Sequence, residues 1–275
     1  MSDPAADIAT LIERSRKAQA QIANYTQEQV DELITAMVYA VAREDRAEEI
    51  AKFTVEETQL GNYDGKYLKI HRKTRATLMD IIDDKSVGVI EELPERNIVK
   101  IAKPIGVIGA LSPSTNPEAT PVIKGIAAVK GRNSIIVAPH PRAKLTNKMI
   151  CDYMREALEL CGAPADLVLY IETPSLDLTN QLMAQCDRIL ATGGGPMVTA
   201  AYSSGTPALG VGVGNACITV DDTANLDEAA EKIRISKTLD LAASCSSDNS
   251  VLLFESIYDE MLAKLVAEGG YVLNE

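Results

Sequence analysis

The chain has 275 residues, of which 46% are hydrophobic and 24% are charged, as in an ordinary globular protein with a sizeable core. Its formal net charge of −12 at pH 7 argues against nucleic acid or an anionic membrane as a partner. The start of the chain lacks the features of a signal peptide, and no apolar run approaches the roughly 20 residues of a transmembrane helix. We therefore expect a cytoplasmic protein.

The first part of the chain has the periodicity of amphipathic helices. Apolar residues recur every three or four positions over Ile8–Ala23 and Glu28–Thr58, and the pattern resumes over Leu68–Ile82. The segment Leu60–Gly65, which contains two glycines, interrupts it. We therefore expect a helical segment over residues 1–85 that packs on the domain that follows.

Two short β-prone runs come next, Val87–Ile90 and Ile98–Ile101, joined by a polar segment. This pattern predicts a β-ribbon over residues 86–103.

From residue 104 onward, short apolar runs alternate with helical patterns. Such alternation predicts an α/β fold with a doubly wound, mainly parallel, Rossmann-like sheet over residues 104–240, which binds ligands at the carboxyl ends of its strands. The predicted strands are Ile105–Leu111, Ser134–Ala138, Leu167–Ile171, Arg188–Ala191 and Ala216–Val220. The predicted helices end at Lys130 or span Thr146–Cys161, Leu176–Gln185 and Leu226–Leu239, the last with a capping box of Asn225 and Glu228.

The segment between Ala119 and Cys151 contains no acidic residue. Such a stretch in an acidic chain indicates either a site for an anionic ligand or a solvated basic face, and the sequence does not decide between them. Its cationic residues, together with His140, are Lys124, Lys130, Arg132, Arg142, Lys144 and Lys148.

Two loops carry further candidate groups. The run Gly193–Gly195 follows a strand and precedes a helical pattern, so it either holds a phosphate against backbone N–H groups or merely turns the chain. Asn116 lies in a turn before a helix that must begin between Asn116 and Thr120, because Pro121 belongs in its first turn. Its amide either caps the turn or points into a site as a hydrogen-bond donor.

Five cysteines are spread along the chain without a Cys-x-x-Cys pair, and only two histidines are present. We therefore expect reduced thiols, with neither a disulfide framework nor a metal site. Cys151, Cys161, Cys186 and Cys217 fall in helical or strand patterns and are expected in the core. Cys245 lies in a loop of small residues that leaves room for a substrate carbonyl, although composition alone favours neither a catalytic nor a structural role.

Taken together, several segments resemble the CoA-acylating branch of the aldehyde dehydrogenase superfamily, in order and in spacing. These segments are Pro104–Pro117, Ser134–Lys144, Ala191–Gly195, Ala201–Asn215 and Ser236–Ser247.

The resemblance implies a role for each matching residue. Cys245 matches the nucleophile, and Asn116 matches the asparagine that stabilises the oxyanion. The residues implied to contact the NAD or NADP cofactor are Ser112, Thr115, His140, Arg142, Lys144, Gly193, Gly194, Leu209 and Gly210.

One departure from the family pattern is informative. Hydrolytic aldehyde dehydrogenases carry a Glu-Leu-Gly-Gly motif whose glutamate activates water, whereas this chain has Ala208-Leu-Gly-Val211. Without that base, coenzyme A is expected to accept the acyl group. The alternative is that Ala208 merely packs and another base lies elsewhere.

Within this branch, the likeness is greatest to the sulfoacetaldehyde dehydrogenases. It implies sulfoacetaldehyde as the substrate, with succinate semialdehyde and acetaldehyde as alternatives. Such enzymes generally use NADP⁺, and NAD⁺ is the alternative cofactor. Arg142 or Lys144 would suit a 2′-phosphate. The alternative interpretation is that these two cations bind only coenzyme A, or no ligand at all.

The resemblance also bears on the extent and assembly of the protein. Family members continue well beyond residue 275, so residues 241–275 are expected to be the start of a truncated catalytic domain. The ribbon resembles the family's oligomerisation arm, which implies a homo-oligomer, either a dimer or a tetramer. Two other functions stay open, a nucleotide-binding fragment without catalysis and a structural protein that binds neither cofactor nor coenzyme A.

Overall fold

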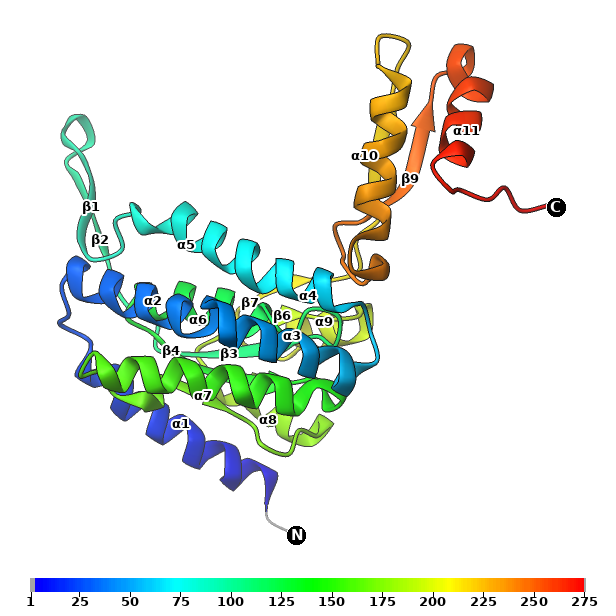
Figure 1. The fold of residues 1–275 in the computed structure, drawn as a ribbon. Helices are drawn as coiled ribbons and strands as arrows, with labels where there is room; N and C mark the ends of the chain where they lie inside the picture. Colours follow the sequence, from blue (N-terminus) through cyan, green and yellow to red (C-terminus); the bar gives the residue numbers. More distant parts are fainter. Residues whose placement is uncertain (1–2, 275) are drawn as a thin grey trace.

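The computed structural model describes residues 3–274. The N-terminal part is helical, as the periodicity predicts, and its helices pack around the body of the molecule (Figure 1). They are α1 (Pro4–Gln21), α2 (Gln27–Ala42), α3 (Glu44–Thr58), α4 (Tyr63–Leu68) and α5 (Thr74–Ile82), with a π-helical turn, η1 (Lys69–Lys73), between the last two.

Two of the predicted helix boundaries are wrong. The pattern over residues 28–58 is two helices, because Arg43 adopts an extended conformation between α2 and α3. The interruption at Leu60–Gly65 is also shorter than predicted. The Asn62 side chain accepts a hydrogen bond from the Gly65 N–H and caps α4, so the helix begins before the second glycine.

A two-stranded ribbon projects from the body (Figure 1). Strands β1 (Gly88–Leu93) and β2 (Ile98–Ala102) pair antiparallel and are joined by the 3₁₀ turn η2 (Pro94–Arg96). Its apolar side chains are exposed on both strands, including Val99 and Ile101.

The centre of the molecule is a five-stranded sheet in the order β5-β4-β3-β6-β7, and every pairing in it is parallel. This confirms the predicted α/β fold with a doubly wound, Rossmann-like sheet. β7 is a strand that the sequence did not reveal. The strands are β3 (Val107–Ser112), β4 (Ser134–Pro139), β5 (Val168–Tyr170), β6 (Arg188–Thr192) and β7 (Ala208–Val211).

Helices cover both faces of this sheet. Ile108 and Ala110 of β3 face a core built with α2, α6 (Thr120–Lys130) and α7 (Lys144–Leu160). Val107 and Leu111 alternate to the opposite face, where they meet α1, α8 (Leu176–Gln185) and α9 (Gly195–Ser203). The chain winds outward from β3 in both directions, so its topological switch point lies between β3 and β6.

The last part of the chain forms a smaller unit beyond the sheet (Figure 1). It contains a parallel strand pair and two helices around a small core of Val220, Ala230, Ile233 and Met261. These elements are β8 (Ala216–Val220), α10 (Leu226–Thr238), the 3₁₀ turn η5 (Leu239–Ala242), β9 (Asp248–Leu253) and α11 (Tyr258–Ala267).

The predicted capping box at α10 is half correct. Asn225 accepts hydrogen bonds from the N–H groups of Asp227 and Glu228. The Glu228 carboxylate instead pairs with Lys232, so the cap is not reciprocal.

The structure also corrects the prediction that four cysteines lie in the core. Cys151 and Cys186 are buried and Cys161 is half-buried, but Cys217 is exposed. Strand β8 is covered on one face only, by α10 and α11, and Cys217 and Thr219 point to the open face.

Within residues 3–274, no helix combines the length and the apolar character that crossing a bilayer requires.

Candidate active site

A cleft of about 550 Å³ lies where the carboxyl ends of β3 and β6 meet the C-terminal unit. Its lining comes mainly from the turn after β3, the turn after β6, the linker from β7 to β8, and the loop between η5 and β9, together with His140 after β4 and Lys237 of α10. Asn116, Gly193, Gly194 and Cys245 all belong to this lining. The cleft therefore brings the predicted nucleophile, the predicted oxyanion donor and the predicted phosphate turn together.

Cys245 is exposed, in contrast to the buried Cys151 and Cys186. It follows η5 and precedes β9, and its small neighbours Ala243 and Ser244 also line the cleft. The backbone of Gly214 passes behind it, where a Cβ would lie 2.9 Å from the Cys245 carbonyl oxygen. The sulfur is thus presented by a loop that is held closely from one side.

Asn116 serves the fold with its backbone and faces the cleft with its side chain. Its carbonyl oxygen accepts from the N–H and hydroxyl of Thr120 and so begins α6. Its Nδ2 donates to the Thr115 Oγ1 at 3.1 Å, which leaves one amide hydrogen for a ligand. Its Oδ1 is buried without a hydrogen-bond partner within the described chain.

The glycine turn separates β6 from α9. Gly194 is the N-cap residue of α9, and the Gly193 N–H donates to the Val211 carbonyl at 3.2 Å. Both glycines also line a smaller hollow of about 140 Å³ that adjoins the cleft and contains Ser112 and His140. The Ser112 hydroxyl is buried there without a hydrogen-bond partner among the described residues. A polar ligand is the kind of group that would satisfy it.

Three cations of the basic stretch, Lys124, Lys130 and Arg132, form neither an anionic-ligand site nor a solvated basic face. Lys124 donates to the carbonyls of Leu111, near the end of β3, and Leu190, in the middle of β6. Lys130 and Arg132 are buried and also hold backbone carbonyls, so these three side chains contact the fold and not a ligand.

The remaining candidate site residues of this stretch, His140, Arg142 and Lys144, lie in different surroundings. His140 lines the cleft, and partial burial of its ring and the nearby Arg142 lower its pKa, which favours the neutral form. The Arg142 guanidinium donates to the Thr58 carbonyl at 2.9 Å, and Lys144 is an exposed residue at the start of α7. In the described part of the chain, neither Arg142 nor Lys144 lines the cleft.

Leu209 and Gly210 lie within β7, while the four residues Val211–Gly214 line the cleft. Gly210 is needed where it is, because a Cβ there would lie 2.7 Å from Val198 and 2.8 Å from the Tyr202 ring. Lys237, which was not singled out from the sequence, also lines the cleft and donates to Asn249 at 3.0 Å. Over residues 3–274, the lining includes no Asp or Glu.

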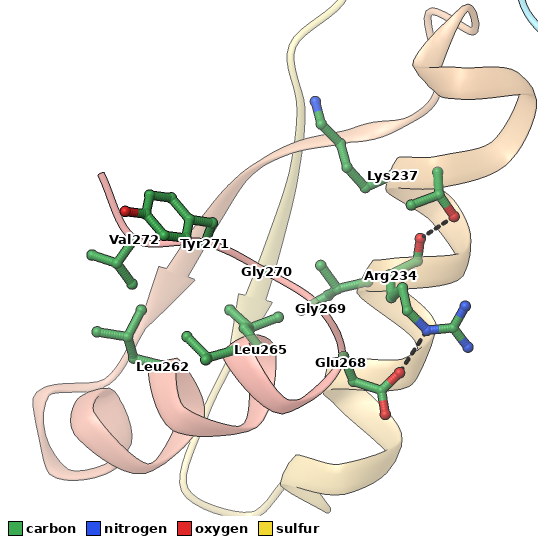
Figure 2. A pocket seen from close by; sticks show the side chains of 12 residues that line it. Arg234, Lys237, Leu262, Leu265, Glu268, Gly269, Gly270, Tyr271 and Val272 are labelled. Atoms are coloured by element: carbon green, nitrogen blue, oxygen red, sulfur yellow. Dashed lines mark hydrogen bonds and ion pairs between the residues drawn. The ribbon is translucent and has the colours of Figure 1, made fainter. Parts of the chain in front are cut away.

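A second pocket, of about 410 Å³, lies between α10 and α11 and is largely apolar. Figure 2 shows Leu262, Leu265 and Val272 around it, and the ion pair of Arg234 with Glu268 at its edge. It contains none of the predicted site residues, so the cleft at Cys245 is the candidate active site.

The model of the aldehyde dehydrogenase family matches residues 2–269. The chain belongs to the aldehyde dehydrogenase family. A relative from Acholeplasma sp, a sulfoacetaldehyde dehydrogenase, is 49% identical over 98% of this chain and 56% of its own length.

Two solved aldehyde dehydrogenases have the same fold. An acetylating aldehyde dehydrogenase from Geobacillus thermoglucosidasius is 38% identical with a TM-score of 0.93, over 99% of this chain and 60% of that one. A propionaldehyde dehydrogenase from Rhodopseudomonas palustris, solved with bound CoA and an acylated cysteine, is 28% identical with a TM-score of 0.86, over 98% of this chain and 61% of that one. The chain thus spans little more than half the length of these aldehyde dehydrogenases.

Proposed function

We propose that this chain carries the nucleophile and the nucleotide-binding part of a CoA-acylating aldehyde dehydrogenase. The observation that carries the proposal is that exposed Cys245 and the Asn116 amide line one cleft beside the Gly193–Gly194 turn. The solved propionaldehyde dehydrogenase with an acylated cysteine and bound CoA supports it.

In this mechanism the Cys245 thiolate attacks the aldehyde carbonyl carbon, and the carbonyl oxygen becomes an oxyanion. The free Asn116 amide hydrogen and the Cys245 backbone N–H donate to that oxygen. Loss of hydride from the same carbon leaves a thioester on Cys245. The thiolate of CoA then attacks the thioester carbonyl, and the Cys245 thiolate leaves.

The residues of the cleft fit a nicotinamide dinucleotide. The unpartnered Ser112 hydroxyl and the glycine turn before α9 offer polar contacts in adjoining hollows. Ser112, Thr115, His140, Gly193 and Gly194 would hold the cofactor, and Leu209 and Gly210 would support it from β7. When bound, NAD⁺ or NADP⁺ accepts the hydride. Because Thr58 engages Arg142, a contact with a 2′-phosphate would fall to Lys144.

We propose sulfoacetaldehyde as the aldehyde, supported by the 49% identical relative. The test is CoA-dependent reduction of NAD⁺ or NADP⁺ by the whole protein with sulfoacetaldehyde, succinate semialdehyde and acetaldehyde. Sulfoacetaldehyde should give the highest kcat/KM, and a clear preference for either other aldehyde would overturn the substrate proposal.

A pair of cysteine variants tests the nucleophile. Cys245→Ala should abolish acyl-CoA formation, and Cys217→Ala, the matched loss of another exposed thiol, should retain it. Turnover that survives Cys245→Ala would refute the mechanism. Nucleotide-dependent thermal stabilisation without turnover in the parent protein would instead indicate a binding protein.

A further inference from the structure

A cluster of four charged side chains lies buried beside the cleft. Lys66, Lys69, Glu118 and Asp240 are each at most 5% exposed. They come from α4, η1, the turn before α6, and η5. Charged groups with so little exposure are rare unless they are paired, and here two positive and two negative charges balance.

Asp240 is the centre of this cluster. Its Oδ2 pairs with the Lys66 Nζ at 2.9 Å and with the Lys69 Nζ. Its Oδ1 accepts from the Asn62 N–H at 2.9 Å. The Glu118 carboxyl lies 3.6 Å from Lys66 and 3.8 Å from Lys69 and makes no hydrogen bond within the described chain. Burial raises its pKa and the two lysines oppose that rise, so its interaction with the cluster is electrostatic.

The two lysines also reach the two halves of the candidate active site. The Lys66 Nζ donates to the Thr115 carbonyl at 2.7 Å, next to Asn116. The Lys69 Nζ donates to the Ala243 carbonyl at 3.1 Å, two residues before Cys245. Because both ammonium groups share one carboxylate oxygen, movement of one carbonyl relative to the other is resisted.

The backbone around Asp240 is shaped for this contact. Asp240, Leu241 and Ala242 all have positive φ, a conformation that persists in non-glycine residues only where the surroundings enforce it. On the opposite side, a Cβ at Gly61 would lie 1.9 Å from Asp240 Oδ1, and one at Gly65 would lie 2.5 Å from Asp240 Cβ. The two glycines of the segment Leu60–Gly65 therefore make room for Asp240.

We propose that Lys66 and Lys69, joined through Asp240 and balanced by Glu118, are positioning residues that fix the Asn116 loop against the Cys245 loop. None of the four lines the cleft as described, so they act through the Thr115 and Ala243 carbonyls. The catalytic part of this inference rests on the proposed function, whereas the coupling of the two loops does not.

Two double variants, each of which removes one lysine and one carboxyl group, test the Lys66–Thr115 and Lys69–Ala243 contacts separately. Lys66→Met with Glu118→Gln removes the donor to Thr115, and Lys69→Met with Glu118→Gln removes the donor to Ala243. Backbone hydrogen exchange in the whole protein should rise roughly tenfold or more at residues 114–116 in the first variant only, and at residues 243–247 in the second only. The control is Asp31→Asn with Lys130→Met, a largely buried pair at the far end of α6, which should alter neither segment.

Faster exchange in a different segment for each variant distinguishes a positioning role from a purely structural one. If the cluster only stabilised the fold, either variant would raise exchange in both segments. Equal effects of the two variants, no effect, or the same effect in the control would overturn the proposal. If a Met variant does not fold, the corresponding Lys→Gln variant, which keeps an uncharged amide donor, is measured in its place. Hydrogen exchange should rise in the same segment.

Turnover gives the second readout. Each cluster variant should lower kcat about a hundredfold and change KM little, as expected when reacting groups are misplaced. Unchanged kcat in both would overturn the positioning role. A parent protein without acyl-CoA formation would refute the proposed function alone, since the exchange pattern still tests the coupling of the loops.

Discussion

Gly214 and Cys245 meet through their backbones, such that a Cβ on Gly214 would lie 2.9 Å from the Cys245 carbonyl oxygen. The linker from β7 to β8 thereby supports the Cys245 loop from behind. This contact limits how far the Cys245 loop can move toward the linker.

Gly214→Ala should displace the Cys245 loop. We expect kcat to fall by roughly tenfold to a hundredfold, because small misplacements of a reacting group are costly. The strain should lower the free energy of unfolding by about 1–3 kcal/mol, measured by urea unfolding. Gly212→Ala is the control for stability, since a Cβ there meets Val198 only at 3.9 Å. Equal loss of stability in the two variants would contradict this account.

Asn116→Ala should separate catalysis from folding. The Asn116 carbonyl, not its amide, begins α6, so the free energy of unfolding should change by less than about 1 kcal/mol. The lost oxyanion donor should cost about 3 kcal/mol of transition-state stabilisation, a hundredfold or more in kcat. Steady-state kinetics and thermal unfolding check both. A large loss of stability with normal kcat would assign Asn116 to the fold.

Lys124 should give the protein a distinctive dependence of stability on pH. Burial lowers its pKa to about 7, against about 10.4 in an unfolded chain. Between these values the unfolded state binds more protons, so stability rises with pH across this window, and the penalty for the buried charge is complete below about pH 7.

Urea unfolding of the parent and of Lys124→Met at pH 6, 7, 8 and 9 tests this. Above pH 7 the parent should gain up to about 1 kcal/mol per pH unit relative to the variant. The gain should fall short of the full pKa difference, because the side chain as a whole is only half-buried. Parallel curves for the two proteins would show that Lys124 keeps its proton throughout.

Lys144 and Arg142 should differ in their effect on cofactor choice. Arg142 already donates to the Thr58 carbonyl, so Arg142→Gln should leave the Kd for NADP⁺ within about threefold. Lys144→Gln should weaken NADP⁺ about tenfold and leave NAD⁺ nearly unchanged, as loss of a charged phosphate contact requires. Isothermal titration calorimetry with both nucleotides would measure this, and the reverse ranking would mean that Arg142 leaves Thr58 when the cofactor binds.

The sheet was predictable because its strands are short apolar runs that alternate with amphipathic helices. The helix Leu176–Gln185 and the strand Ala216–Val220 were predicted with their observed bounds, but this strand pairs with β9 outside the five-stranded sheet, which corrects its predicted place. β7 was missed because it is only four residues long and contains a glycine. Cys217 was misplaced because an apolar strand gives no sign that only one of its faces is covered.

The cleft was predictable only in part. Cys245, Asn116 and the glycine turn carry local signatures, a loop of small residues, a turn and a strand-to-helix glycine run. Lys66 and Lys69 carry none, because single lysines in an amphipathic helix look like solvent-facing residues until their partner Asp240 is placed beside them in space. Likewise the basic stretch could not reveal that its cations bind backbone carbonyls.

Because cations of the basic stretch bind backbone carbonyls, the cleft contains little positive charge, and this affects how nucleotide binding depends on ionic strength. Lys124, Lys130 and Arg132 are engaged by carbonyls, and within residues 3–274 Lys237 is the only Lys or Arg lining the cleft. In the proposed complex, the pyrophosphate would be held largely by backbone N–H groups at the start of α9, and Lys144 would contact only the 2′-phosphate of NADP⁺. Added salt should therefore weaken nucleotide binding far less than it would in a cleft lined with lysine and arginine.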